Sequence, residues 1–144
     1  MSFLTTAISI AEEVHVNQTD KAGRPYIEHV EHVASKVRGD VAKSVAYLHD
    51  VLEDGAISEG ELLLKGIPVD VVNAVVSLTR KKGESYNAYI HRVGTNNLAI
   101  AIKLVDLAHN ADMTRLEHIT TSDIKRTQKY LSAMKYLMEL PLSV

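Results

Sequence analysis

One short stretch, residues 46–54, constrains the fold of this chain more than any other. Its sequence is AYLHDVLED, in which His49, Asp50, Glu53 and Asp54 interrupt an otherwise apolar segment. Burying unpaired charged groups is costly, so these side chains need compensating partners if the segment packs into a core. On a helix, residues three or four apart share a face, so His49, Asp50 and Glu53 can turn to one side. The stretch therefore predicts a helix with a candidate metal site on one face.

The composition limits the ligands of such a site. The chain contains no cysteine, so disulfides and thiolate ligands are excluded, and a metal must be held by histidine, carboxylate and water. The 144 residues, of which 46% are hydrophobic, suffice for one core and leave no room for a second. We therefore expect residues 1–144 to form a single domain, with the further ligands supplied by its other helices.

Charge and hydropathy exclude two classes of partner. No run approaches the roughly 18 apolar residues of a membrane span, and the first residues, MSFLT, lack the basic and long apolar regions of a signal peptide. The formal charge of −2, without a Lys/Arg stripe, argues against binding to duplex nucleic acid. We expect a cytoplasmic protein, and the charge remains compatible with a small phosphorylated ligand, which needs only a few local cations.

Apolar residues recur at helical spacing along most of the chain. The pattern predicts helices over about residues 3–18, 26–37, 41–53, 58–64, 69–78, 86–93, 98–117 and 123–139. Valines make a strand conceivable over residues 69–78, but their four-residue repeat favours a helix. In the last helix we expect Ile124, Leu131, Met134 and Leu137 to face inward, with Met138 also filling the core. The fold class is therefore all-α, with about seven or eight helices.

The predicted helix over residues 98–117 carries a second polar face. Asp106 lies among apolar neighbours, with Lys103 three residues before it and Asn110 four residues after it. These spacings place the three side chains on one side of a helix, and Thr114 continues that face. Lys103 is most simply interpreted as the partner of a carboxylate.

The metal-ligating residue types occur at a recognisable spacing. His29, then His49-Asp50, then Asp106 resembles the H…HD…D metal signature of the HD superfamily of phosphohydrolases. In addition, residues 23–29 (GRPYIEH), 48–54 (LHDVLED), 78–80 (LTR) and 103–106 (KLVD) resemble, in order, the hydrolase domain of bacterial alarmone hydrolases, which remove the 3′-pyrophosphate of (p)ppGpp. The resemblance extends from about residue 11 to 116 and is to the small stand-alone relatives. It implies a single HD-domain helical bundle.

The resemblance also implies a site with one metal ion. Its ligands would be His29, His49, Asp50 and Asp106, completed by water, and Mn²⁺ is the usual ion of the family. Two imidazoles and two carboxylates also suit Fe²⁺ or Zn²⁺. Glu53 and Asp54 would orient or deprotonate the attacking water, with Glu53 the first choice for the base.

Substrate contacts follow from the same resemblance. Asn110 matches a substrate-binding residue, while Lys21, Arg24 and Arg115 could meet phosphates, the last two mainly on the basis of their charge. The alarmone hydrolases usually carry a base-stacking Arg before this lysine, whereas this chain has Asp20. A carboxylate supplies neither the cation nor the stacking plane of that Arg.

Three functions are consistent with these residues. The first is a metal-dependent phosphohydrolase of a phosphorylated nucleotide, most specifically one resembling guanosine 3′,5′-bis(diphosphate) 3′-pyrophosphohydrolase. The second, favoured by Asp20, is an HD-type phosphomonoesterase or nucleotidase for another small phosphorylated metabolite. The third is a non-catalytic nucleotide-sensing module, which the presence of both Glu53 and Asp54 disfavours.

Four other polar residues have structural interpretations. We expect His15 to be a hydrogen-bonded structural histidine near a helix end, and Tyr26 to be a packing residue with a tethered hydroxyl group. His109 and Asp112 are expected behind the ligands or at the surface.

Overall fold

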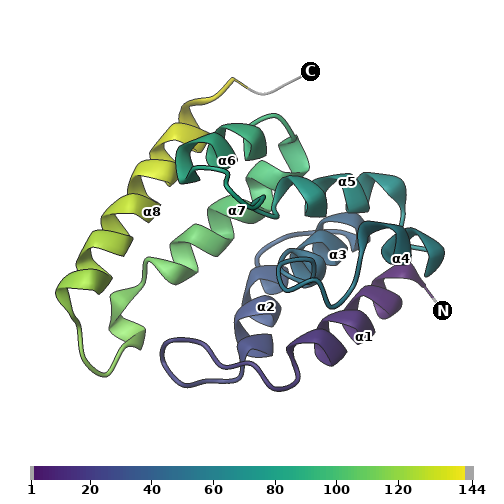
Figure 1. The fold of residues 1–144 in the computed structure, drawn as a ribbon, viewed down its shortest axis with the longest axis horizontal. Helices are drawn as coiled ribbons and strands as arrows, with labels where there is room; N and C mark the ends of the chain where they lie inside the picture. The colour runs from purple at the N-terminus through teal and green to yellow at the C-terminus, as the bar shows by residue number, and fades with distance from the viewer. Residues whose placement is uncertain (1, 142–144) are drawn as a thin grey trace.

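The computed structural model describes residues 2–141, and helices account for most of them (Figure 1). Within this range the chain forms eight α-helices, one short 3-10 helix and no strand. They are α1 (Phe3–His15), α2 (Tyr26–Ser35), α3 (Asp40–Leu48), α4 (Glu59–Leu64), α5 (Val69–Ser77), α6 (Tyr86–Val93), α7 (Asn97–Asn110), the 3-10 helix η1 (Met113–Arg115) and α8 (Thr121–Glu139). The all-α prediction is confirmed.

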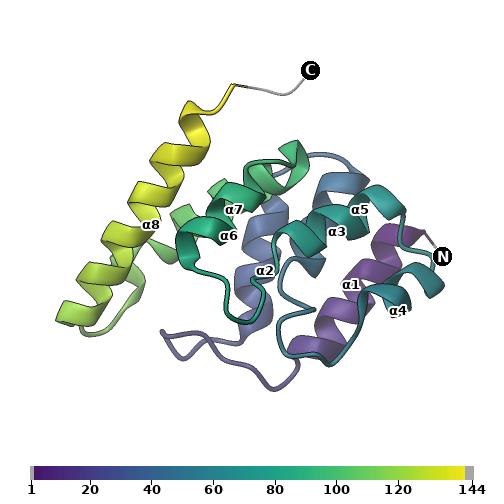
Figure 2. The same ribbon diagram turned by 45° about the horizontal axis from the view of Figure 1, so that its top comes forward.

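Helix α3 lies at the centre of the bundle. It packs against α1, α2, α5 and α7, and its Val45 and Leu48 are fully buried. Helix α5, whose valines left a strand conceivable, is helical and buries Val71, Val72 and Val75 on one side. Helix α8 lies at the edge of the bundle, where it contacts only α6 and α7 extensively (Figure 2).

Side-chain caps begin several of the helices. The Ser58 side chain accepts the Glu61 amide at the start of α4, and Glu61 reaches back to complete a capping box. Thr120 caps α8 in the same way with Asp123. These caps satisfy amide groups that have no partner within the helix, and each contributes about 1 kcal/mol.

The prediction that α3 continues to residue 53 was wrong. The helix ends at Leu48, and the chain then forms turns up to Gly55, whose φ of 71° is readily adopted only by glycine. At this end the His49 ring contacts the Ala46 carbonyl oxygen, with Nδ1 at 2.6 Å. The candidate ligands His49 and Asp50, with Glu53, therefore lie in turns rather than on one helical face.

The prediction that α7 continues to residue 117 was also wrong. The helix ends at Asn110, and the Asp112 side chain accepts the Thr114 amide to start η1. Thr114 consequently does not continue the polar face of α7. Because a short polar residue offers the backbone an alternative hydrogen bond, Asp112 favours a new turn over helix continuation.

Three of the apolar residues expected inside α8 face outward. Ile124, Leu131 and Met138 are exposed, whereas Leu137 is buried and Met134 half-buried, as expected. Helix α8 packs against the rest of the described chain on one side only, so the side chains on its opposite face are exposed to solvent. None of the helices within residues 2–141 is both long and apolar enough to cross a membrane.

Candidate metal centre

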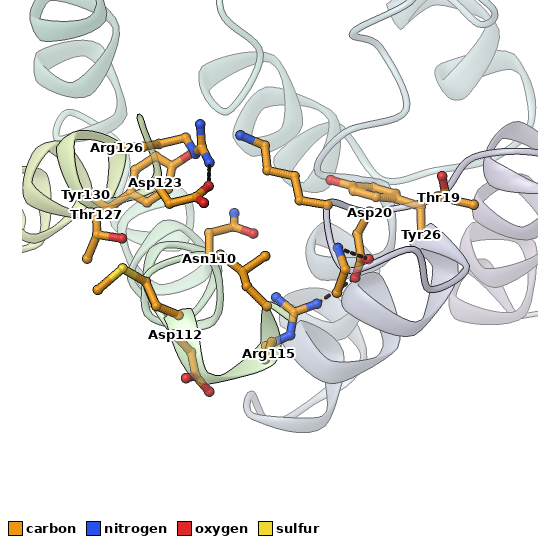
Figure 3. Close-up of a pocket in the computed structure, with 14 residues that line it drawn as sticks. Thr19, Asp20, Tyr26, Asn110, Asp112, Arg115, Asp123, Arg126, Thr127 and Tyr130 are labelled. Atoms are coloured by element: carbon orange, nitrogen blue, oxygen red, sulfur yellow. Dashed lines mark hydrogen bonds and ion pairs between the residues drawn. The ribbon is translucent and has the colours of Figure 1, made fainter. Parts of the chain in front are cut away.

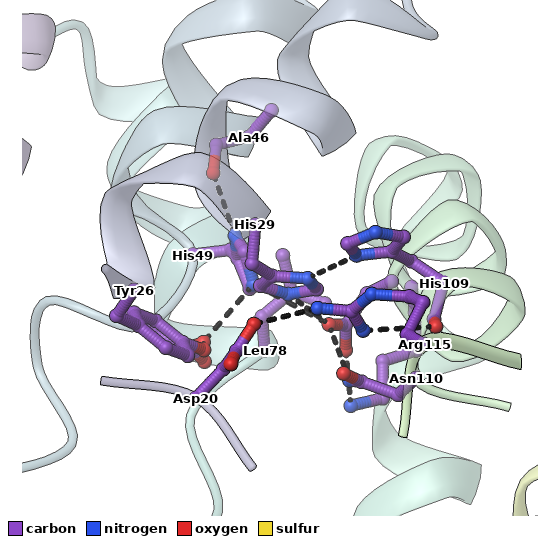
Figure 4. A network of polar contacts seen from close by, with 12 residues as sticks. Asp20, Tyr26, His29, Ala46, His49, Leu78, His109, Asn110 and Arg115 are labelled. Atoms are coloured by element: carbon purple, nitrogen blue, oxygen red, sulfur yellow. Dashed lines mark hydrogen bonds and ion pairs between the residues drawn. The ribbon is translucent and has the colours of Figure 1, made fainter. Parts of the chain in front are cut away.

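Four candidate ligands from distant parts of the chain lie close together inside the bundle. Figure 4 labels two of them, His29 and His49. His29 lies on α2, His49 and Asp50 directly follow α3, and Asp106 lies on α7. Ligand atoms of His29, His49 and Asp50 lie within 4.8 Å of one another. The Asp106 Oδ1 atom lies 2.9 Å from His29 Nε2 and 3.5 Å from His49 Nε2.

The His49 ring has a nitrogen suited to a metal. Its Nδ1 lies 2.6 Å from the Ala46 carbonyl oxygen, which can only accept, so Nδ1 carries a proton. The buried Nε2 lies 3.1 Å from Asp50 Oδ2, but has no properly oriented hydrogen-bond partner within residues 2–141. A buried nitrogen without a hydrogen bond, surrounded by carboxylate oxygens, fits a metal ligand better than a structural group.

The electrostatics of the cluster favour a positive charge at its centre. Burial lowers the pKa of His49, but Asp50 and Asp106 outweigh burial and hold this pKa well above its usual value. Burial raises the pKa of Asp106, but Lys103, His29 and His49 outweigh it and hold this pKa well below its usual value. A divalent cation would meet the same demand for positive charge.

Three groups tether the carboxylates. The Tyr26 hydroxyl donates to Asp50 Oδ2, and Lys103 Nζ donates to Asp106 Oδ2 at 3.0 Å. Asn110 Nδ2 donates to Asp106 Oδ1, also at 3.0 Å. The interpretations of Tyr26 as a tethered hydroxyl and of Lys103 as a carboxylate partner are confirmed.

His109 lies directly behind His29. The two Nδ1 atoms are 2.7 Å apart, and the His32 ring lies against His109 with centroids 3.9 Å apart. Burial, and then the nearby Arg115, lower the pKa of His109 to about 4. His109 is thus in contact with a candidate ligand.

The candidate catalytic acids lie on the turns after α3, and both side chains are exposed. Partial desolvation of the Glu53 carboxyl, and then the Asp50 carboxylate, raise the pKa of Glu53, which makes its carboxylate a stronger base. Asp54 Oδ2 accepts a hydrogen bond from Gln18 Nε2 at 3.2 Å. Gln18 Oε1 in turn lies 2.9 Å from Nδ1 of His15, which is buried and hydrogen-bonded as expected.

A cavity of about 400 Å³ adjoins the cluster (Figure 3). Tyr26 and Asn110 line it, and each also hydrogen-bonds a candidate ligand. The remaining lining residues come from the loop before α2, from the segment after α7 and from α8. They are Thr19, Asp20, Lys21, Ala22, Asp112, Met113, Arg115, Leu116, Asp123, Arg126, Thr127 and Tyr130.

The cavity contains three of the four candidate substrate residues. Lys21, Asn110 and Arg115 line it, and burial followed by repulsion from Arg126 lowers the pKa of Lys21. Arg24 is not among the lining residues, because its exposed guanidinium pairs with Glu28 at 2.9 Å.

Arg115 is held by a partner within the cavity. Its Nη2 lies 2.6 Å from Asp20 Oδ2, and Asp20 Oδ1 also accepts the amides of Ala22 and Arg24. The carboxylate at position 20 thus shapes its own loop and neutralises a cation that sequence reasoning assigned to phosphate.

The α8 wall of the cavity was missed by sequence reasoning. Its lining residues are Asp123, Arg126, Thr127 and Tyr130, and Arg126 pairs with Asp123. Their spacing of three, four and seven residues marks one helical face, which was the available signal. That α8 would turn this face toward α7 was not evident from the sequence.

No family model matches the chain. Among curated proteins, it is 32% identical over 118 residues to the "Probable guanosine-3′,5′-bis(diphosphate) 3′-pyrophosphohydrolase" of Synechocystis sp., covering 72% of this chain. It is 28% identical over 138 residues to the "Guanosine-3′,5′-bis(diphosphate) 3′-pyrophosphohydrolase" of Borreliella burgdorferi, covering 85% of this chain. The matched regions span only 16% and 20% of those two proteins.

A solved structure shares the fold. It is described as "A metazoan ortholog of SpoT hydrolyzes ppGpp and plays a role in starvation responses". Its TM-score is 0.78 at 21% identity, over 96% of this chain and 86% of that one. The resemblance to the alarmone hydrolases is confirmed in sequence by the curated relatives. The all-helical fold of this chain is shared with the solved structure.

Proposed function

We propose that this chain is a metal-dependent phosphohydrolase of a phosphorylated nucleotide, most specifically a guanosine 3′,5′-bis(diphosphate) 3′-pyrophosphohydrolase. One observation carries the proposal: the buried His49 Nε2, without a hydrogen bond, lies among imidazole and carboxylate groups from separate helices and beside a cavity lined by cations. The names of the curated relatives support the substrate class.

One divalent ion would be held by His29, His49, Asp50 and Asp106. Two imidazoles and two carboxylates suit Mn²⁺, our first choice, and also Fe²⁺ or Zn²⁺. Such an ion polarises a phosphoryl oxygen and acidifies bound water. Tyr26 and Lys103 would hold the two carboxylate ligands in place, because each donates a hydrogen bond to one of them.

Glu53 would accept the proton of the attacking water. Its raised pKa favours this role, since a base works best when its pKa approaches the working pH. Asp54, held by the Gln18 amide, would orient the water.

The cavity would hold the nucleotide. Its volume of about 400 Å³ falls within the usual range for small-molecule sites. Lys21 offers positive charge for phosphates, and Asn110 lies between the cavity and the metal ligands. Arg126 is paired with Asp123. Arg115 contributes less charge to a phosphate while Asp20 remains bound to it.

A second candidate is an HD-type phosphomonoesterase or nucleotidase. The observation that favours it is Asp20, which stands where the alarmone hydrolases usually carry a base-stacking Arg and is bound to Arg115. A substrate without a guanine base would not need that Arg.

Product analysis distinguishes the candidates. Protein reconstituted with Mn²⁺ is incubated with ppGpp and, separately, with nucleoside monophosphates, and the products are resolved by ion-exchange chromatography. The proposed function predicts GDP and pyrophosphate from ppGpp. Orthophosphate released from monophosphates alone would support the second candidate, and tight ppGpp binding without turnover would support a sensing module.

A further inference from the structure

We infer that His109 is a positioning residue that fixes His29 in the protonation form able to bind a metal. The inference rests on the metal centre of the proposed function. It concerns a contact between α7 and α2 that joins residues 80 positions apart.

Both nitrogens of the His29 ring have neighbours. The side chain is 2% exposed, its Nε2 faces Asp106 Oδ1 at 2.9 Å, and its Nδ1 faces His109 Nδ1 at 2.7 Å. At that separation one of the two Nδ1 atoms donates and the other accepts.

Only one arrangement of the proton is compatible with a metal on Nε2. Because the Asp106 carboxylate can only accept, Nε2 facing it alone would carry the proton, and binding a metal there requires that proton to leave. Neutral His29 then carries its proton on Nδ1, where it donates to His109. If His109 donates instead, neutral His29 carries its proton on Nε2 and cannot bind a cation there. The acceptor at His109 thus selects the useful tautomer, as the outer partners of metal-binding histidines generally do.

The geometry fits a hydrogen bond between the two Nδ1 atoms. The planes of the two rings are only 12° apart and their centroids are 4.9 Å apart. Because the nitrogens are closer than two stacked rings can approach, the rings must lie side by side and nearly coplanar (Figure 4). In that arrangement the N–H bond of one ring points along the in-plane lone pair of the other.

A second ring fixes the plane of His109. His32, one turn after His29 on α2, lies nearly parallel to His109, with planes 16° apart and centroids at 3.9 Å. The stacked His32 and the backbone of α7 therefore limit rotation of the acceptor.

An imidazole in this place differs in charge from the carboxylate that often orients a metal-binding histidine. The cluster already contains the buried Asp106 and the half-buried Asp50, with Glu53 nearby. A neutral acceptor orients His29 without adding a further negative charge, whereas a carboxylate there would increase the repulsion among the acids.

The test measures metal affinity rather than activity. Mn²⁺ dissociation constants are determined by chelator competition for the wild-type protein, His109→Ala, His109→Asn and the control His32→Ala. We expect His109→Ala to bind 10- to 100-fold more weakly, the usual effect of removing an outer partner. We expect His109→Asn, whose amide oxygen can accept, to recover much of the loss, and His32→Ala to change affinity several-fold at most.

A direct readout of the tautomer keeps the inference testable if an alanine variant fails to fold. In ¹⁵N NMR of the Zn²⁺-loaded wild-type protein, His29 should carry its proton on Nδ1, with a slowly exchanging signal that His109→Asn preserves. Protonation of His29 on Nε2, or unchanged affinity in His109→Ala, would overturn the inference. Failure of the wild-type protein to bind any divalent metal would instead contradict the proposed function.

Discussion

At the scale of single residues, Asp20 shows how a carboxylate can occupy a place that a resemblance assigns to a cation. Its two oxygens serve different purposes: Oδ1 closes the loop before α2, and Oδ2 pairs with Arg115. Replacement by Arg would therefore remove a turn and bring two guanidinium groups together.

Asp20→Asn should improve substrate binding. The amide oxygen can keep the loop hydrogen bonds while the negative charge beside Arg115 is lost, so the guanidinium can attract phosphate more strongly. We expect KM for ppGpp to fall by roughly fivefold, which corresponds to about 1 kcal/mol. Arg24→Gln is the matched control, because it removes a charge from an exposed pair outside the cavity and should leave KM unchanged. An unchanged KM in Asp20→Asn would exclude Arg115 as a phosphate contact.

Glu53→Gln should separate metal binding from chemistry. The substitution keeps the shape of the side chain but removes the basic oxygen, so we expect kcat to fall by about 10²-fold or more while metal stoichiometry stays the same. Because the pKa of Glu53 is raised, the acid limb of the kcat/KM profile should lie above the ordinary glutamate value. That limb should be absent in the variant; retention of both the limb and the rate would exclude Glu53 as the base.

At the scale of helices, the way an element ends matters as much as its face. Helix α3 stops at Leu48, and the following turns carry two candidate ligands and both candidate catalytic acids. Helix α7 stops at Asn110, and the following segment reaches the cavity with Arg115. Chain that has left a helix can aim successive side chains at one place, which a straight helix cannot do.

The start of α8 provides a test of the cavity wall that α8 forms with Asp123, Arg126, Thr127 and Tyr130. Thr120→Ala removes the hydroxyl that accepts the Asp123 amide and should cost about 1 kcal/mol of unfolding free energy, measured by urea denaturation. Because Asp123 also pairs with Arg126 in the cavity, KM should rise several-fold while kcat changes little.

Ser58→Ala is the matched control for the cap. It removes an equivalent capping box at α4, none of whose residues lines the cavity. A similar loss of stability without a change in KM would assign the effect of Thr120→Ala to the α8 wall. Equal changes in KM for both variants would instead indicate a general loss of stability.

At the scale of the whole molecule, the candidate metal centre joins helices that are far apart in the chain. Its candidate ligands come from α2, α7 and the turns after α3. The carboxylates raise the pKa of His49, while Lys103 and the histidines lower the pKa of Asp106. A cation that binds only the folded form stabilises it by mass action. Folding and metal binding are therefore expected to be coupled.

Metal removal should lower the melting temperature. With free metal at 100 times its dissociation constant, the bound ion adds about 2.7 kcal/mol, which corresponds to roughly 10 °C for a domain of this size. Scanning calorimetry with Mn²⁺ and with chelator measures the difference. His49→Ala should show no dependence on metal; a variant that responds like the wild-type protein would contradict the ligand set.

The sequence by itself determined the helices and the residue types of the candidate site. Helical spacing and capping residues are local signals, so they identified α4, α5 and α8 within a few residues. The spacing of His29, His49, Asp50 and Asp106 identified the candidate ligands through resemblance, and all four lie together in the structure.

Only the tertiary structure decided which side chains face the cavity and what holds them. Arg24 turns to Glu28 nearby, whereas Arg115 reaches Asp20 across 95 positions and His109 reaches His29 across 80. Ile124 is exposed and Tyr130 lines the cavity because α7 packs against one particular face of α8. Local periodicity defines a face of a helix, but the packing of distant elements decides what that face meets.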